Sequence, residues 1–466
     1  MSAQTPLVQI RSVLANESLQ AAIYTSTGRL MEKRRQSIQP DLLPDFQELR
    51  QQAHAIKAHT IDHLDHYLSE FERNLEAHGG RVIWCRTGEE AADCILRLAR
   101  ERGARLIVKS KSMTSEEVHL NEQVARHGFE TVETDLGEYI IQLAEQRPFH
   151  IVAPALHMTR YDVAALFSSK LGVERETAPE RQTLIARKVL REKFLCADIG
   201  ITGANFLVAD SGAVVLVENE GNARLTSSAP RIHIAIAGVE KVIPRAQDLA
   251  VFLKLLGRSA TGQPLTVYTS LLSGPRRAAE PDGPEEFYVI LLDNGRTKLL
   301  QRPERRQSLF CIRCGACLNH CPVYRKIGGH TYPWVYSGPI GAILTPQFHG
   351  PESAPWLPYA SSLCGACGEV CPVKIDIPRL LLELRAEITA AKARVGKGLA
   401  ERVVWRAFTF LMTHPALYRA FLRLAPVAAP LGTWLPPLRA WKSQRELPMP
   451  ARKAFRRLLA EKRRGG

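Results

Sequence analysis

Four motifs that mark common enzyme classes are absent from this sequence of 466 residues. It contains no G-x-G-x-x-G loop after a predicted strand, no Walker A loop, no H-E-x-x-H pair and no G-x-S-x-G elbow. These absences argue against an independent nicotinamide- or flavin-binding domain, an ATPase, a zinc protease and a hydrolase with a nucleophile elbow. Because all four motifs are missing, none of them identifies a catalytic residue in this sequence.

The sequence also lacks a hydrophobic run long enough to cross a membrane. The uncharged run at residues 424–438 has 15 residues and four prolines, whereas a crossing helix needs about 20 apolar residues. No basic stretch followed by an apolar segment and a small-residue cleavage site opens the chain, which argues against secretion. Cysteines that must stay reduced to bind metal agree with a cytoplasmic location.

Acidic residues are scarce near the C-terminus. Residues 391–466 contain 17 Lys and Arg but three acids, so nearly all of the formal charge of +15 lies in this tail. Apolar segments at 403–411 and 424–438 lie among the arginines, a pattern that suits an anionic membrane surface or an acidic partner subunit. A solvated basic tail is the alternative. Its aromatic and basic residues lack the order of a nucleic-acid-binding motif, so we expect no nucleic acid partner.

Cysteine, in contrast, is concentrated in one region. Seven of the ten cysteines form the runs Cys311-x2-Cys314-x2-Cys317-x3-Cys321-Pro322 and Cys364-x2-Cys367-x3-Cys371-Pro372. In two-cluster ferredoxins the first three cysteines of such a run bind one cluster, and the fourth binds the other. The spacing therefore predicts two 4Fe–4S clusters that share ligands between the two runs.

Applied position by position, this rule assigns a ligand set to each cluster. Cluster 1 receives Cys311, Cys314, Cys317 and Cys371, and cluster 2 receives Cys321, Cys364 and Cys367. Ser361 stands where the second run would have a further cysteine, so the fourth ligand of cluster 2 stays open. We favour a non-cysteine or exchangeable ligand, such as the Ser361 oxygen, water, substrate or a partner's side chain, over a lost cluster.

Zinc is the alternative for any group of cysteines. Structural zinc sites prefer two separated pairs of ligands, and a compact run of four cysteines fits that spacing poorly. The three other cysteines, Cys85, Cys94 and Cys196, are scattered through apolar surroundings and are expected to be small core residues.

The segment before the cysteines alternates between strand-like and helix-like patterns, which predicts an α/β domain with a parallel sheet. The predicted strands are residues 81–85, 105–110, 130–134, 150–154, 213–218, 232–238 and 287–292. We expect helices at 245–256 and 378–392, a long exposed helix at 44–75 as a candidate docking arm, and a long ordered loop at 328–358.

The predicted domains are a helical arm (1–75), the α/β domain (76–298), two ferredoxin-type halves (302–331 and 353–382) and the basic tail (391–466).

A candidate anion site lies where a predicted strand gives way to a helix. Its residues are Lys109, Ser110, Lys111 and Ser112, followed by Thr114 and Glu117 at capping-box spacing. Exposed amides at a helix start and two lysines would bind an anion at the carboxyl edge of the sheet. A capped helix with solvated lysines is the alternative.

A second polar edge spans residues 203–224. Glu218 and Glu220 are candidate general bases there, and Arg224 is a candidate carboxylate ligand. Roles in turns or surface ion pairs would explain the same residues.

Together these blocks resemble the lactate-utilisation protein B family, and the match covers nearly the full chain. It rests on residues 109–113 with Glu116 and Glu117, on 133–140, 154–157 and 240–244, and on both cysteine groups with the serine before Cys364. The resemblance implies a LUD-type α/β domain similar to the sugar-isomerase and CoA-transferase fold, then a helical two-cluster ferredoxin domain and a basic helical tail.

The same resemblance implies a function. The chain would be the iron–sulfur electron-transfer subunit of a bacterial complex that oxidises L-lactate to pyruvate and allows growth on lactate. Its implied partners are a protein rich in Cys-Cys-Gly motifs and a second protein with the α/β domain. Where lactate is oxidised stays open. We expect a cytoplasmic protein, with the tail as a candidate for peripheral contact at the inner face of the membrane.

A second hypothesis makes the α/β domain itself an enzyme. It would act on a small acyl or sugar-like anion, and the clusters would serve as a redox sensor or a Lewis acid. The three-cysteine ligand set of cluster 2 keeps this hypothesis open, since an iron without a fixed protein ligand can bind substrate.

Overall fold

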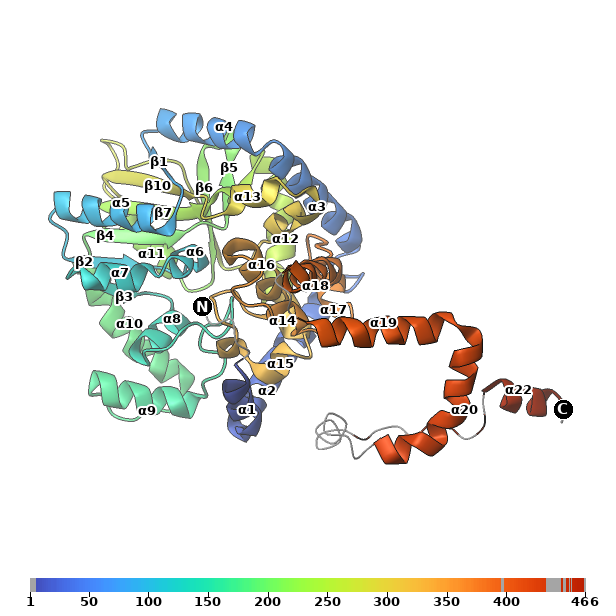
Figure 1. The fold of residues 1–466 in the computed structure, drawn as a ribbon. Coiled ribbons are helices and arrows are strands. Elements are labelled where there is room, and N and C mark those ends of the chain that lie inside the picture. The colour runs from blue at the N-terminus through green and yellow to red at the C-terminus, as the bar shows by residue number, and fades with distance from the viewer. Residues whose placement is uncertain are drawn as a thin grey trace. The chain divides into compact units, whose positions relative to one another are not determined.

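The chain divides into two units, Met1–Ile388 and Thr389–Gly466. The computed structural model describes residues 6–394, 398–432, 446, 450, 451, 453 and 455–464. The first unit contains both β-sheets and all seven clustered cysteines (Figure 1). The cysteine segments and the α/β region therefore pack together in one unit.

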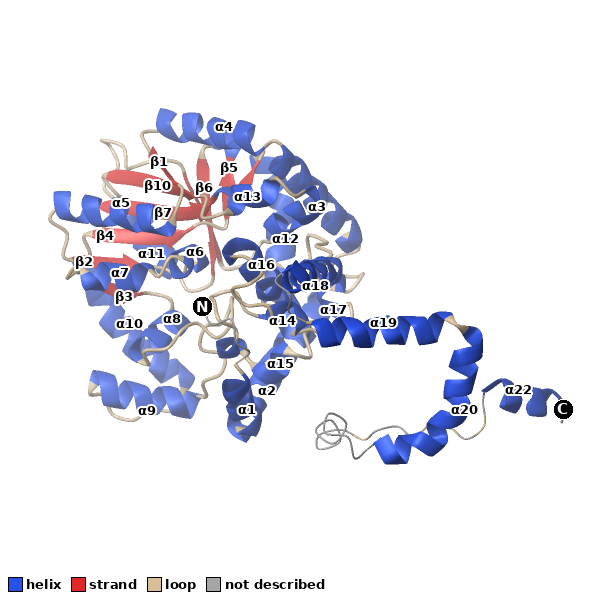
Figure 2. Ribbon diagram, in the orientation of Figure 1, coloured by secondary structure: helices blue, strands red, loops and turns tan. Residues whose placement is uncertain are grey.

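A parallel sheet of six strands forms the centre of the first unit, as Figure 2 shows. Its spatial order is β1-β10-β7-β4-β2-β3, and every neighbouring pair is parallel. The strands are β1 (Arg81–Cys85), β2 (Leu106–Lys109), β3 (Glu130–Glu133), β4 (Ile199–Gly203), β7 (Ile232–Gly238) and β10 (Glu286–Leu292). The aliphatic runs of β7 and β10 are almost wholly buried, as expected for strands covered on both faces. The predicted parallel α/β architecture is confirmed.

Helices cover both faces of this sheet. On one face, α5 (Gly88–Glu101) and α7 (Leu120–Arg126) pack their aliphatic side chains against the isoleucines of β4 and β7. On the other, α8 (Leu136–Leu143), α9 (Arg160–Leu171) and α10 (Pro179–Cys196) form a hydrophobic cluster with β2 and β3. The sheet core is thus closed by layers on either side.

A second, mixed sheet of four strands forms a separate hydrophobic cluster with residues of β7 and β10. Its order is β8-β5-β6-β9, and only the β5–β8 pair is parallel. The strands are β5 (Phe206–Val208), β6 (Ala213–Glu218), β8 (Val242–Ile243) and β9 (Tyr268–Leu272). The sequence predicted only β6. The strands β5 and β8 have three and two residues, too few to form a recognisable apolar run, and β9 is only partly buried.

The N-terminal helices belong to the core of the first unit. They are α1 (Leu7–Ala15), α2 (Glu17–Ser37), α3 (Phe46–Asp62) and α4 (Leu64–Ala77). The prediction of one long exposed helix at residues 44–75 is wrong, because Phe46, Ile61, Leu68 and Phe71 are buried with the second sheet. The histidines and glutamates that suggested exposure are exposed or half-buried, whereas the polar residues Arg50, Lys57 and Thr60 are buried.

Residues 150–154, predicted as a strand, form a turn instead. The backbone N–H of Phe149 donates to the carbonyl oxygen of Pro154 at 2.9 Å. The N–H groups of Val152 and Ala153 donate to Nδ1 of His150 at 3.1 and 3.2 Å. The histidine side chain therefore binds backbone donors that a strand would pair with its neighbour.

The segment between the cysteine runs contains a helix that the sequence did not predict. The helix α16 (Gly338–His349) interrupts the expected loop at 328–358. Pro339 lies in its first turn, where proline is tolerated, and the apolar residues Ile340 and Leu344 are buried. Tertiary packing outweighs the glycine and proline content on which the loop prediction rested.

The first unit contains further helices, most of them short. They are α6 (Met113–Glu117), α11 (Asn222–Ser228), η2 (Val239–Lys241), α12 (Ala246–Ala260), α13 (Arg296–Leu300), η3 (Pro303–Phe310), α14 (Ala316–His320), α15 (Tyr324–Ile327), α17 (Ala366–Glu369) and α18 (Ile377–Arg394). Of these, α12 and α18 match predicted helices.

The second unit is helical where it is described. It contains α19 (Leu399–Thr413), α20 (Pro415–Gly432) and α22 (Phe455–Arg464). Within the described part of the chain, no helix has the length and hydropathy needed to cross a bilayer. Part of the apolar run at 424–438 lies outside the described residues.

Candidate functional site

Four cysteines from both runs line a single cavity. Cys311, Cys314 and Cys317 come from the first run, and Cys371 comes from the end of the second. Apolar side chains form much of the remaining wall, including Ile340 of α16 and Ile375 before α18. The structure thus brings together the four residues predicted as ligands of cluster 1, and no fifth cysteine lines this cavity.

The other three cysteines form a second group. The thiol of Cys367 lies close enough to those of Cys321 and Cys364 for their negative charges to add to the effect of burial, which raises the pKa of Cys367 to about 12. Cys364 is exposed, whereas the other two are buried. The Ser361 hydroxyl accepts a hydrogen bond from the N–H of Leu363 at 3.1 Å. These are the residues predicted around cluster 2, and its fourth ligand stays a prediction.

The sulfur atoms receive backbone hydrogen bonds. The N–H of Tyr324 donates to Sγ of Cys321, and the N–H of Ile375 donates to Sγ of Cys371, both at 3.4 Å. Such donors stabilise thiolates and tune the potentials of iron–sulfur clusters. Burial raises the pKa of Cys314 to about 12 and that of Cys371 to about 11. A bound metal would supply the positive charge that deprotonates them.

Seven sulfurs in two groups, with N–H donors and an apolar wall, fit iron–sulfur clusters. Among the described residues, no three His, Cys, Asp or Glu side chains converge closely enough to hold one isolated metal ion. A 4Fe–4S cluster does not require that convergence, because four thiolates share a cluster of four irons.

Two arginines of the N-terminal helices hold the second cysteine run. Arg50 donates to the carbonyl oxygens of Cys371 at 2.8 and 3.0 Å and of Glu369 at 2.7 Å. Arg34 donates to the carbonyl oxygen of Val370 at 3.0 Å. Both side chains place positive charge near the cysteines. The sequence did not predict these residues, because nothing local marks an arginine whose partners are carbonyls more than 300 positions away.

The predicted anion site is divided by the structure. Lys109 is fully buried, and its ammonium pairs with Glu133 at 2.7 Å and Glu116 at 3.0 Å. Burial opposes this charge, but the two carboxylates outweigh it and raise the pKa of Lys109. Ser112 caps α6 by accepting from the N–H of Ser115 at 3.1 Å, so the predicted capping role of Thr114 is wrong. Lys109 therefore has a structural ion-pair role.

Ser110, Lys111 and Ser112 instead line a cavity of about 330 Å³ at the carboxyl ends of β2, β4 and β6. The turn at residues 151–153, α12, Lys241 of η2, and Ile312 and Arg313 of the first cysteine run complete its wall. The cavity shares three lining residues with the cysteine cavity: Ile151, Ile312 and Arg313. The sheet edge and the first cysteine group are therefore neighbours.

The acidic side of this cavity consists of Asp135, Glu218 and Glu220. Glu218 accepts from the N–H groups of Ala223 and Arg224, both at 2.8 Å, and so caps α11. Burial and the charge of Asp135 raise the pKa of Glu220 to about 7. Of the two predicted general bases, Glu218 is thus bound to a helix end. The Arg224 side chain stacks over Tyr268 and does not line the cavity.

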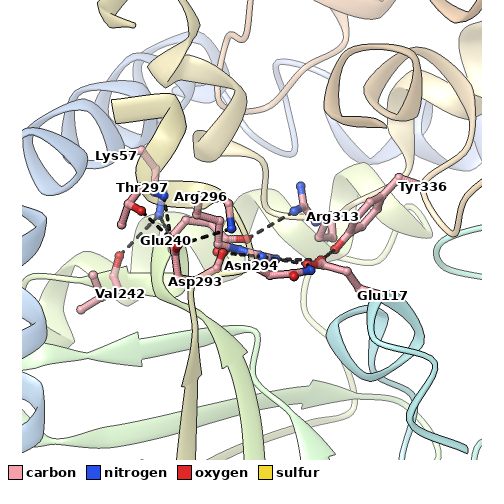
Figure 3. A network of polar contacts seen from close by, with 11 residues as sticks. Lys57, Glu117, Glu240, Val242, Asp293, Asn294, Arg296, Thr297, Arg313 and Tyr336 are labelled. Carbon is pink, nitrogen blue, oxygen red and sulfur yellow. Dashed lines mark hydrogen bonds and ion pairs between the residues drawn. The ribbon is translucent and has the colours of Figure 1, made fainter. Parts of the chain in front are cut away.

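A buried polar network joins the α/β region to the first cysteine run (Figure 3). Arg296 binds both oxygens of Glu117 at 2.8 Å and also donates to Glu240. Tyr336 donates to Glu117 at 2.9 Å, and Arg313 donates to Glu240 at 3.3 Å. Burial would raise the pKa of Glu240, but the two arginines lower it to about 2. Sequence reasoning identified neither arginine, because their partners are distant along the chain.

Three known families match successive parts of the chain. Residues 68–292 match the LUD domain, residues 307–375 match the 4Fe-4S dicluster domain, and residues 384–464 match the C-terminal region of lactate utilisation protein B. Lactate utilization protein B of Bacillus cytotoxicus is 43% identical over 455 residues, covering 96% of this chain and 95% of that protein. The chain belongs to the lactate utilization protein B family.

Other members of this family match equally well. Proteins of the same name from Bacillus thuringiensis and Bacillus cereus are also 43% identical over 96% of this chain and 95% of their own length. A solved structure of a DUF162 family protein from Deinococcus radiodurans is 13% identical, with a TM-score of 0.28, over 49% of this chain and 98% of that one. The likeness to sugar isomerases and CoA transferases stays a prediction, whereas the iron–sulfur domain is established.

Proposed function

We propose that this chain is the iron–sulfur electron-transfer subunit of a complex that oxidises L-lactate to pyruvate. The single observation that carries this proposal is the cavity lined by Cys311, Cys314, Cys317 and Cys371. Relatives named lactate utilization protein B supply the connection to lactate. The 4Fe–4S domain match supplies the type of cofactor.

We infer two clusters with the predicted ligand sets. When bound, they supply one-electron transfer. The chain's own residues prepare the site: the thiolates bind iron, and the apolar wall of Ile340 and Ile375 limits water. Arg34 and Arg50 fix the backbone of the second run and offset negative charge. Cys364, the exposed ligand of the second group, lies where an external donor or acceptor has access.

Partners and location follow from the same proposal. We infer two partner proteins, one rich in Cys-Cys-Gly motifs and one with a LUD-type domain. The described tail exposes large apolar side chains, among them Trp405, Phe408 and Phe421, on helices that also carry arginines. We propose that this tail contacts an anionic membrane surface. Cosedimentation with vesicles that contain phosphatidylglycerol, and not with neutral vesicles, supports that contact; equal sedimentation with both contradicts it.

Growth on L-lactate tests the function. In a strain whose only copy of this gene encodes Cys314→Ala, growth on lactate should stop while the protein is still expressed. The matched control is Cys196→Ala, since Cys196 is exposed and lies outside both cysteine groups. Normal growth of the Cys314→Ala strain would contradict the proposal.

The cavity at the sheet edge favours a second candidate function, in which the α/β region is itself an enzyme for a small anion. Its support is the position of Glu220, whose pKa of about 7 suits a general base, in a cavity of about 330 Å³. Turnover of such a substrate by the purified chain alone would favour this candidate. Strict dependence on the partner proteins would favour electron transfer.

A further inference from the structure

In the part of the chain that the structure describes, the cavity at the sheet edge contains two lysines whose ammonium groups form no ion pair and no hydrogen bond, although the carboxylates of Asp135, Glu218 and Glu220 also line it. Lys241 is 9% exposed and lines the cavity beside the first cysteine run. Among the residues that the structure describes, neither a carboxylate within ion-pair distance nor a hydrogen-bond partner is found for its ammonium group. Glu240 is nearby but binds Arg296 and Arg313.

Lys111 is the second lysine of this cavity for which the described residues supply no ion-pair partner. The residue is half-buried, but its ammonium nitrogen is fully buried and makes no hydrogen bond. The charge of Glu138 attracts it most, followed by those of Asp135 and Glu220, yet none of the three forms an ion pair with it in the described structure.

Arg313 contributes a third unsatisfied donor. Its Nη2 binds Glu240 and its guanidinium lies over the ring of Tyr336, but its buried Nη1 has no partner. The backbone at Arg313 has φ +60°, a conformation that is uncommon for a residue other than glycine. This conformation is part of the loop that carries the side chain to the boundary between the two cavities.

Buried charges in proteins are normally paired, because removing an unpaired ion from water costs several kcal/mol of free energy. Three donors around one cavity lack a hydrogen-bond partner among the described residues: the ammonium groups of Lys241 and Lys111 and Nη1 of Arg313. They point to an anionic ligand that binds beside Lys241 and Arg313, since the carboxylates of Asp135 and Glu220 act on Lys111. The cavity volume of about 330 Å³ is at the small end for ligand sites. Ile151, Val152, Leu256 and Ile312 add an apolar part to the wall.

We propose that this cavity binds a small carboxylate of the 2-hydroxy or 2-oxo acid class, with its carboxylate facing Lys241 and Arg313. The carboxylate follows from the unpaired cations, and the choice of a 2-hydroxy or 2-oxo acid rests on the proposed function. Because Arg313 lines both cavities, the bound acid lies next to the first cysteine group. The sequence alone pointed to Ser110, Lys111 and Ser112, and the structure adds Lys241 and Arg313 to them.

Calorimetric titration of the anaerobically purified full-length chain tests the proposal. L-lactate and pyruvate should bind, and lactamide, which has the same shape without the charge, should not. Lys241→Met should weaken carboxylate binding by about tenfold or more, the loss expected for one charged hydrogen bond. The matched control is Lys254→Met, since Lys254 is an exposed lysine of α12 outside the cavity. Lys111→Met serves as a second variant if Lys241→Met does not fold.

Thermal unfolding separates a ligand site from a structural role. Without ligand, Lys241→Met should unfold at the same or a higher temperature, because it removes an unpaired buried charge. A lower unfolding temperature together with unchanged lactate affinity would overturn the proposal. So would equal binding of lactamide, or binding of inorganic phosphate with no binding of either carboxylate.

Iron analysis of the same samples keeps this inference distinct from the proposed function. Full iron content without carboxylate binding overturns the ligand site and leaves the electron-transfer proposal intact. Carboxylate binding that depends on Lys241 in a chain without iron supports the ligand site and overturns the electron-transfer proposal.

Discussion

Replacing Arg296 with Met should destabilise the first unit far more than the loss of an ordinary ion pair. The Arg296 side chain is 0% exposed, and its partners Glu117 and Glu240 are 0% and 1% exposed. The substitution leaves two carboxylates without their main counter-charge in a site that water does not reach. Breaking a buried pair in this way costs about 3–5 kcal/mol.

A surface pair provides the comparison. Arg102 binds Glu286 at 2.7 Å, but these side chains are 37% and 26% exposed. Arg102→Met should therefore cost at most about 1 kcal/mol. The double variant Arg296→Met, Glu117→Gln should recover part of the loss, because it removes the carboxylate left unpaired while Glu240 keeps Arg313 as its partner.

Urea unfolding of the anaerobically purified chain, followed by circular dichroism, measures these differences. The pH dependence provides a further check. Arg296 and Arg313 lower the pKa of Glu240 from 4.5 to about 2, so this pairing stabilises the wild type above pH 4.5 and the stabilisation is lost as the pH falls toward 2. The gap between wild type and Arg296→Met should narrow over that range. A loss no larger than that of Arg102→Met at neutral pH would refute the reasoning.

Three further predictions concern the cysteine ligands, a buried histidine and two glycines. Cys371→Ala and Cys321→Ala should each leave about four irons per chain but give different electron paramagnetic resonance spectra, because each thiolate is assigned to a different cluster; identical spectra would contradict shared ligands between the two runs. Burial lowers the pKa of His233 from 6.5 to about 3. Between these pH values the unfolded chain binds a proton that the folded chain does not, so the free energy of unfolding decreases as the pH falls. Between pH 7.5 and 5.5, the free energy of unfolding measured in urea should decrease by about 1.4 kcal/mol less in His233→Gln than in the wild type. An equal decrease in both would count against this assignment. A Cβ atom at Gly200 would meet a backbone carbonyl oxygen of α11 at 1.8 Å, so Gly200→Ala should lower the free energy of unfolding by about 1–3 kcal/mol or more. Gly28→Ala, where no atom lies within 4 Å, should instead stabilise its helix by about 0.5–1 kcal/mol; the reverse order would show the packing argument to be wrong.

The features that the sequence predicted are those with a strong local signal. The predicted strands at 81–85, 213–218 and 232–238 coincide with β1, β6 and β7, since each is a continuous aliphatic or β-branched run. The cysteine spacing indicated in advance which four thiols would line one cavity. In both cases the pattern lies within a few residues and has few alternative explanations.

The features that the sequence did not predict depend on contacts between distant segments. Lys241 and Arg313 lie 72 positions apart and meet at one cavity only because η2 and the first cysteine run pack together. Arg50 has an unremarkable place in a polar helix, and its role comes from carbonyl groups of the second cysteine run. The helix α16 forms within a segment rich in glycine and proline because its apolar side chains are buried.

The central claim is that cysteines from two separated runs together bind two 4Fe–4S clusters. Iron and acid-labile sulfide analysis of the anaerobically purified chain, combined with electron paramagnetic resonance, tests it most directly. The account predicts about eight irons and eight sulfides per chain, with spectral changes on addition of L-lactate only when the partner proteins are present. Zinc in place of iron, or a chain without metal, would contradict it.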